Sequence, residues 1–136
     1  MDYLLDTNTC IALNKGQPTS VRAQFDKAVR RGAVWVPAIV LFELWYGVAR
    51  SARPKENAED LATFLGGPVR ILGFDGEDAR EAGVVRASLE RIGRPIGAYD
   101  TLIAGQALNR KLTLVTANTK EFARVKGLAW EDWGKT

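Results

Sequence analysis

The feature that most limits the fold is the alternation of short apolar runs with longer helical patterns along the chain. The apolar runs predict strands at residues 3–5, 34–36, 69–72, 112–116 and 128–130. Strands that alternate with helices form crossover units and a parallel sheet. We therefore expect an α/β fold in which helices flank a parallel sheet of about five strands.

Helical spacing of apolar residues, with capping and stop signals, predicts what lies between the strands. The segments expected as helices are residues 20–32, 38–50, 61–65, 75–93, 101–109 and 119–124. Ser20 is expected to cap one of these helices and Gly32 to end it, and Asp75 is expected to begin another. The residues after the first strand, starting at Asp6, and the polar stretch 51–60 are expected to be connections.

Composition bounds the size and location of the protein. With 136 residues, of which 46% are hydrophobic, residues 1–136 are expected to form a single domain. No apolar run approaches the ~20 residues that a membrane helix needs, and no basic segment precedes the first apolar residues, so we expect neither a membrane segment nor a signal peptide. The single cysteine, Cys10, cannot form an internal disulfide, which favours the cytoplasm.

The absence of histidine narrows the chemistry. It excludes Ser-His triads and His-ligated zinc sites, so catalysis must depend on carboxylates, lysines, tyrosines or a metal. The net charge of +3 permits a polyanionic partner without requiring one.

Two acids stand out by their surroundings. Asp6 directly follows the first expected strand, where side chains of an open parallel sheet enter the crevice; a turn or capping role is the simpler alternative. Glu43 is the only charged residue in the apolar stretch 34–49. A carboxylate there is costly to bury unless it is paired or binds a metal. The alternative is a solvent-facing stripe with a salt bridge to Arg50.

Two further acids begin expected helices. Asp100 precedes an apolar helix, and Glu121 follows the strand expected at 112–116. Each has a capping explanation, because Asp is a favoured N-cap, and Asn118 with Glu121 three residues later matches a capping box. Capping and catalysis do not exclude each other. The case for a functional site therefore depends on the set of four acids.

Four carboxylates at one edge of a sheet repel each other and lose hydration. A divalent cation relieves both costs, and hard oxygen ligands favour Mg²⁺ or Mn²⁺. A metal among acids can lower the pKa of a bound water and stabilise charge on a phosphate during displacement. The acids are therefore compatible with metal-dependent cleavage of phosphodiesters, without any histidine.

Five short motifs occur in order along the chain: LDTN at 5–8, FE at 42–43, GRPIG at 93–97, DTLIAGQA at 100–107 and VTANTKEF at 115–122. The C-terminal sequence GLAWEDW at 127–133 adds to them. Together these motifs resemble the VapC toxins, the PIN-domain ribonucleases of bacterial type II toxin–antitoxin pairs.

The resemblance implies a PIN-like parallel sheet flanked by helices and a metal-dependent endoribonuclease that uses Mg²⁺ or Mn²⁺. The residues that match the family's acidic metal ligands are Asp6, Glu43 and Asp100. Glu121 matches the position of a fourth catalytic acid, and Asn8 and Asn118 match polar residues that border the site. The resemblance also implies a homodimer, a VapB-like antitoxin that covers the site, and a transfer RNA substrate cut near the anticodon.

The expected reaction is hydrolysis that leaves a 5′-phosphate and a 3′-hydroxyl. Thr7 could orient a water at the site or simply bond the backbone, and Arg86 and Arg94 could grip the RNA backbone or be ordinary surface charges. Two alternatives remain. One is a haloacid-dehalogenase-like phosphatase with Asp6 as nucleophile, although such enzymes usually carry an Asp where Asn8 stands. The other is a non-catalytic binding module in which the acids only cap helices and face solvent.

Overall fold

The computed structural model describes residues 1–135, so Thr136, the last residue of the expected domain, lies outside the described residues. The strands are β1 (Tyr3–Leu5), β2 (Val34–Pro37), β3 (Arg70–Leu72), β4 (Thr113–Val115) and β5 (Trp130–Glu131). The helices are α1 (Thr7–Lys15), α2 (Thr19–Arg31), α3 (Ala38–Ala49), α4 (Pro54–Leu65), α5 (Gly76–Arg91), α6 (Ala98–Arg110) and α7 (Thr119–Phe122). Within residues 1–135, no helix is both long and apolar enough to cross a membrane.

The strand β1 lies in the middle of the sheet, whose strand order is β3-β2-β1-β4-β5. Every neighbouring pair of strands is parallel, which confirms the predicted α/β fold with a parallel sheet. The chain moves from β1 outward through β2 and β3, then returns to the other side of β1 for β4 and β5. The strand order therefore reverses between β1 and β4. Ligands of open α/β sheets bind at such a point, beyond the carboxyl ends of the strands.

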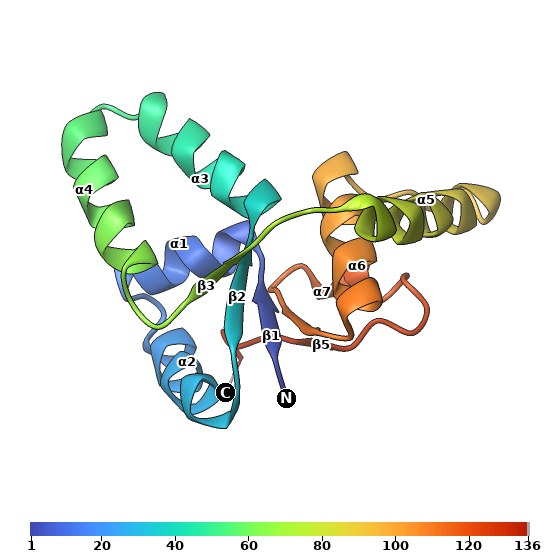
Figure 1. Ribbon diagram of the computed structural model, residues 1–136, viewed down its shortest axis with the longest axis horizontal. Coiled ribbons are helices and arrows are strands. Elements are labelled where there is room, and N and C mark those ends of the chain that lie inside the picture. The colour runs from blue at the N-terminus through green and yellow to red at the C-terminus, as the bar shows by residue number, and fades with distance from the viewer. Residues whose placement is uncertain (136) are drawn as a thin grey trace.

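Helices cover both faces of this sheet (Figure 1). Helices α1 to α4 gather on one side, and α5 and α6 pack together on the other. The central strand is buried on both faces, since Tyr3, Leu4 and Leu5 are each at most 1% exposed. A strand covered on both faces needs apolar residues at every position, which explains the unbroken apolar run.

The helices α5 and α6 approach each other closely. Gly105 permits this, because a Cβ atom at that position would collide with the backbone of Ala82. Val85 and Leu89 of α5 are buried beside them. The packing fixes the axis of α6, the helix whose first turn carries Asp100.

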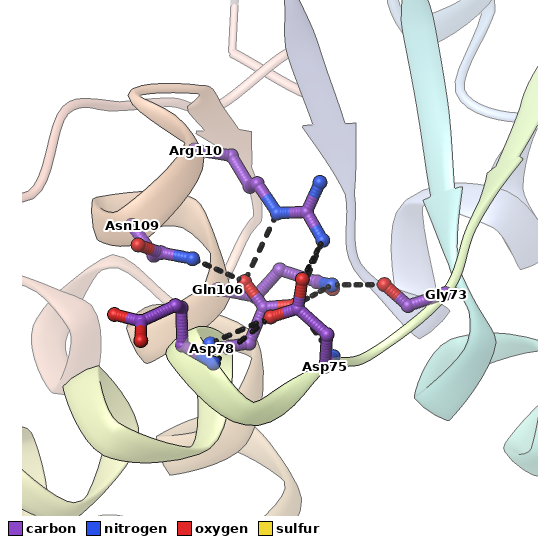
Figure 2. Close-up of polar contacts among 7 residues, drawn as sticks. Gly73, Asp75, Asp78, Gln106, Asn109 and Arg110 are labelled. Atoms are coloured by element: carbon purple, nitrogen blue, oxygen red, sulfur yellow. Dashed lines mark hydrogen bonds and ion pairs between the residues drawn. The ribbon is translucent and has the colours of Figure 1, made fainter.

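A buried carboxylate ties the same two helices together (Figure 2). Asp78 of α5 is fully buried and accepts hydrogen bonds from Gln106 (3.0 Å), Asn109 (2.8 Å) and the guanidinium of Arg110 (3.1 Å). Burial alone would raise the pKa of Asp78, but these donors hold the pKa well below its usual range. These four residues, called the Asp78 network below, anchor the last turns of α6 to α5.

The segment after β1 differs from the prediction. Residues expected to form a connection form the helix α1, which ends at Gly16 in the left-handed conformation with φ 73°. Only Thr9, Cys10 and Leu13 of this helix are buried. A helix with so few buried positions has a weak apolar period, which is why the sequence pattern did not indicate it.

Two helix starts were also placed wrongly. The polar stretch 51–60 is largely helical, because α4 already begins at Pro54, a residue favoured in the first turn. Pro18, and not Ser20, stands at the N-cap of α2. The Ser20 hydroxyl instead donates to the carbonyl of Gly134 at 3.4 Å.

Candidate active site

Asp6 stands where β1 ends and α1 begins. Its Oδ1 accepts a hydrogen bond from the backbone N–H of Thr9 at 2.9 Å, so Asp6 caps α1 while facing the edge between β1 and β4. The side chain is only 6% exposed. Burial raises the pKa of Asp6, and hydrogen bonds with Thr116 and Thr9 offset only part of that rise. The capping role considered from the sequence is therefore real, and the carboxylate also carries unfavourable buried charge.

Glu43 lies in α3 and is half-buried. Its Oε1 accepts a hydrogen bond from the Thr7 hydroxyl at 2.8 Å, which links α1 to α3. The alternative of a salt bridge to Arg50 is wrong, since no such ion pair occurs in the part of the chain that the structure describes. The Arg50 guanidinium instead lies 5.4 Å from the centroid of the Tyr46 ring. Thr7 therefore orients a carboxylate rather than bonding the backbone.

Asp100 lies within the first turn of α6 and does not cap it. The N-cap is Gly97, whose carbonyl accepts a hydrogen bond from the Thr101 hydroxyl at 2.9 Å. The Asp100 side chain is half-buried, and its Oδ2 accepts a long hydrogen bond of 3.5 Å from the Asn118 amide. The capping explanation for Asp100 is therefore wrong, which leaves its carboxylate without that structural role.

Glu121 lies in the short helix α7, three residues after Asn118 at the N-cap. The expected capping box is absent, because the Asn118 side chain makes no capping hydrogen bond. That side chain reaches Asp100 instead, while the Asn118 backbone N–H donates to the Thr116 hydroxyl at 2.9 Å. Capping thus fails to explain Asn118, which borders the carboxylate of Asp100.

Electrostatics connect the four acids. The pKa of Asp100 is raised to about 6 by burial and by the negative charges of Glu121, Asp6 and Glu43. The fold has therefore brought the other three predicted acids close enough to Asp100 to repel its charge. No lysine or arginine pairs with any of them among residues 1–135. The cluster holds negative charge that no side chain of the described chain compensates.

The donor atoms suit a hard divalent cation, since all are carboxylate oxygens. As they stand, no three His, Cys, Asp or Glu side chains within the described range lie close enough together to enclose a metal ion. The uncompensated charge, rather than a finished cage, is what fits the cluster to a metal.

Two residues at this edge escaped the sequence prediction. Asp132 follows β5, and its charge adds to the rise in the pKa of Asp6. Thr116 follows β4, is fully buried and bonds Asp6. Polar residues after the strands of a parallel sheet face the crevice, but Thr116 lies inside the strand expected at 112–116, and β5, which spans only two residues, gives a weak strand signal before Asp132.

The other residues predicted to take part in the site form no hydrogen bond or ion pair with the side chains of the four acids in the described part of the chain. Asn8 is exposed in the first turn of α1, and no hydrogen bond within residues 1–135 joins its side chain to the four acids. Arg86 pairs with Glu90 at 3.2 Å on the exposed surface of α5, as an ordinary helix-surface charge does. Arg94 is exposed in the loop before α6.

The model of the PIN domain matches residues 3–128. A tRNA(fMet)-specific endonuclease VapC of Shigella flexneri is 41% identical over 133 residues, which is 98% of each chain. The crystal structure of VapBC2 from Rickettsia felis, bound to a DNA fragment from its promoter, contains a chain that is 35% identical with a TM-score of 0.92, covering 98% of this chain and 99% of that one. The DNA-bound VapBC of Salmonella typhimurium contains one that is 38% identical with a TM-score of 0.90, covering 98% of each.

Proposed function

This chain belongs to the PIN-domain family, among its VapC ribonucleases, and we propose that it is the toxin of a type II toxin–antitoxin pair that cuts RNA with Asp6, Glu43, Asp100 and Glu121. The observation that carries the proposal is the uncompensated charge of these acids beside the switch point of the sheet, where the pKa of Asp100 is raised to about 6. The phosphatase alternative is set aside, because the relatives are nucleases.

The cofactor in this proposal is Mg²⁺ or Mn²⁺, held by Asp6, Glu43 and Asp100. Support comes from the all-oxygen donor set and from the absence of any cationic side chain paired with these acids among the described residues. When bound, such a cation supplies a water of lowered pKa and neutralises charge that builds on the phosphate.

The chain's own residues keep the carboxylates in position. The Thr9 backbone N–H and Thr116 hold Asp6, and the Thr7 hydroxyl holds Glu43 at 2.8 Å. Asn118 borders Asp100 and Glu121 adds negative charge beside it. In this proposal the reaction is hydrolysis of the phosphodiester, which leaves a 5′-phosphate and a 3′-hydroxyl.

The substrate and partners follow from the relatives. Because a relative at 41% identity is named a tRNA(fMet)-specific endonuclease, we take a transfer RNA, cut near the anticodon, as the substrate. The similar chains in VapBC structures support a VapB-like antitoxin that blocks the acid cluster. We further propose that residues 1–136 form one nuclease domain that acts as a homodimer in the cytoplasm, where its RNA substrate is found.

Incubation of the antitoxin-free protein with total bacterial RNA tests the proposal. Discrete cuts are expected with Mg²⁺ or Mn²⁺ and not with EDTA. Asp6→Asn and Asp100→Asn should each lower the cleavage rate by at least about 100-fold, because each removes a charged ligand of the cation that would neutralise the phosphate. The new ends should carry 5′-phosphate, since a 2′,3′-cyclic phosphate would mean attack by the RNA's own 2′-hydroxyl.

Asp75→Asn is the matched control. Asp75 is an exposed acid that caps α5, and Asn caps about as well, so the same change of charge is made outside the cluster. Its cleavage rate should stay within about twofold of the unchanged protein. A folded protein that cuts no RNA under any metal condition would favour the non-catalytic binding module instead.

A further inference from the structure

A pocket of about 460 Å³ opens directly beside the acid cluster. Thr7 and Glu43 form part of its wall, so the pocket is continuous with the proposed catalytic edge. The rest of the wall is mainly aromatic, from Phe42 and Tyr46 of α3 and Tyr99 of α6. A substrate that reaches Glu43 therefore also meets these rings.

The three rings are exposed although they are large and apolar. Phe42 is 55% exposed, Tyr46 57% and Tyr99 47%. Phe42 and Tyr99 meet edge to face, with ring centroids 5.9 Å apart at 66°, which joins α3 to α6. Phe42 and Tyr46 are four residues apart and so lie on the same side of α3. Apolar groups that are exposed together in one patch mark an interaction surface or a ligand-binding groove.

A cation completes the pocket wall. Arg50 lies over the Tyr46 ring at 5.4 Å, and no carboxylate pairs with it in the described part of the chain. Its guanidinium is therefore open to an anionic group from another molecule.

We propose that Phe42, Tyr46 and Tyr99, together with Arg50, form a platform on which unpaired bases of the RNA substrate stack. This inference rests on the proposed function and names the form of RNA that the site takes: a single-stranded loop or end. Phe42 is next to Glu43 in the chain, and Tyr99 is next to Asp100. The nucleotides that flank the cleaved phosphate therefore fall on the rings.

Single-stranded RNA fits this surface better than a duplex or a peptide. A duplex hides its base faces, whereas unpaired bases stack readily on Tyr, Phe and Arg planes. Stacking accepts every base, which suits a pocket whose wall is mainly aromatic. A wholly apolar peptide would match the rings but would leave the Arg50 guanidinium without an anionic partner.

Binding by fluorescence anisotropy tests the platform without cleavage. The protein is the full chain carrying Asp6→Asn, and the probes are a labelled single-stranded RNA of about ten nucleotides and an abasic ribose-phosphate strand of equal length. Tyr46→Leu and Tyr99→Leu should each weaken RNA binding about 10-fold and leave abasic binding unchanged, because only the ring is lost. Tyr99→Phe, which keeps the ring, should bind RNA normally.

The arginine is tested with its own matched pair. Arg50→Gln should weaken both strands and flatten the salt dependence of binding, since it removes a phosphate contact. Arg70 lies over the Trp35 ring at 5.6 Å, the same arrangement outside the pocket, so Arg70→Gln should bind both strands as before.

The outcomes separate this inference from the function on which it rests. If the Leu variants bind RNA as well as Asp6→Asn alone does, and cut RNA as well as the unchanged protein when they are made without Asp6→Asn, the platform is refuted while the ribonuclease stands. A peptide partner then becomes the occupant to test. If the unchanged protein neither binds nor cuts RNA, the proposed function fails and the platform fails with it. Unfolding midpoints that match within error verify that the Leu variants are folded.

Discussion

The two ends of α6 hold carboxylates in opposite electrostatic states. At the last turns of α6, Asp78 of the neighbouring α5 is fully buried. Donors from α6, including Arg110, nevertheless hold its pKa below the usual range. In the first turn, Asp100 is only half-buried, yet its pKa rises to about 6. Burial and the charges of three other acids raise the pKa of Asp100, and only one long hydrogen bond from Asn118 lowers it.

Burial therefore does not decide whether a carboxylate is stabilised in this protein; its partners do. The Asp78 network supplies donors to both carboxylate oxygens, and such a group serves the fold. The acids around Asp100 lack any cationic side chain within residues 1–135, so their charge must be met from outside. Perturbed acids in a crevice mark functional sites for this reason.

The largest expected effect on stability comes from disrupting the Asp78 network. Asp78→Asn should lower the free energy of unfolding by about 3–5 kcal/mol, because Arg110 loses its buried partner and an amide N–H₂ then faces other donors. The Arg110 side chain is 33% exposed, which favours the lower part of that range. Urea unfolding at pH 7 measures the change.

Asp75→Asn is the control for this prediction. Asp75 also contacts Arg110, at 3.2 Å, but its side chain is 59% exposed. An exposed pair contributes less than about 1 kcal/mol, and Asn still caps α5. Equal losses in the two variants would mean that the buried network is no more stabilising than a surface ion pair.

The second prediction concerns the uncompensated end. Saturating Mn²⁺ or Mg²⁺ should raise the free energy of unfolding, by about 2.7 kcal/mol at a hundred times the dissociation constant. Asp6→Asn and Asp100→Asn should each reduce that gain, whereas Asp75→Asn should keep it. Thermal unfolding with and without the cation measures the shift, and no shift in the unchanged protein would count against a metal at this cluster.

Much of this contrast was open to prediction from sequence, and the limits have physical causes. The parallel sheet followed from the alternation of strands and helices, and Asp6 followed from its position after a strand. Whether Asp100 caps α6 depends on where the helix starts to within three residues, which sequence patterns do not resolve. Asp132 was missed because β5 spans only two residues.

The Asp78 network was beyond sequence reasoning for a different reason. Its members come from α5 and α6, and nothing local indicates that Asp78 will meet Gln106, Asn109 and Arg110. From sequence alone, Asp78 is an acid in the first turn of a helix, a common and favourable surface position. Asp78 is buried because α5 and α6 pack together, an approach that Gly105 permits.

The third prediction is that removing charge from the acid cluster stabilises the metal-free protein. Asp100→Asn should raise the free energy of unfolding in EDTA by about 1 kcal/mol, because repulsion from Glu121, Asp6 and Glu43 is relieved. Solvent screening of the half-buried side chain and the loss of an acid near the start of α6 keep the gain small. Urea unfolding at pH 7 tests it, and a destabilised variant would mean that Asp100 is compensated after all.

The smallest expected effect is on pH dependence. Since the pKa of Asp100 is raised from 3.8 to about 6 in the folded state, the folded protein binds its proton more readily than the unfolded chain. The stability from that proton is fully present below about pH 4 and is lost as pH rises through about 6. In EDTA, the free energy of unfolding of the unchanged protein should therefore rise by up to about 1 kcal/mol between pH 7 and pH 5, relative to that of Asp100→Asn. Comparing the two proteins cancels most effects of the other titratable groups. Parallel stability curves for the two proteins would show that the charges of Glu121, Asp6 and Glu43 do not act on Asp100, and the contrast between the two ends of α6 would then disappear.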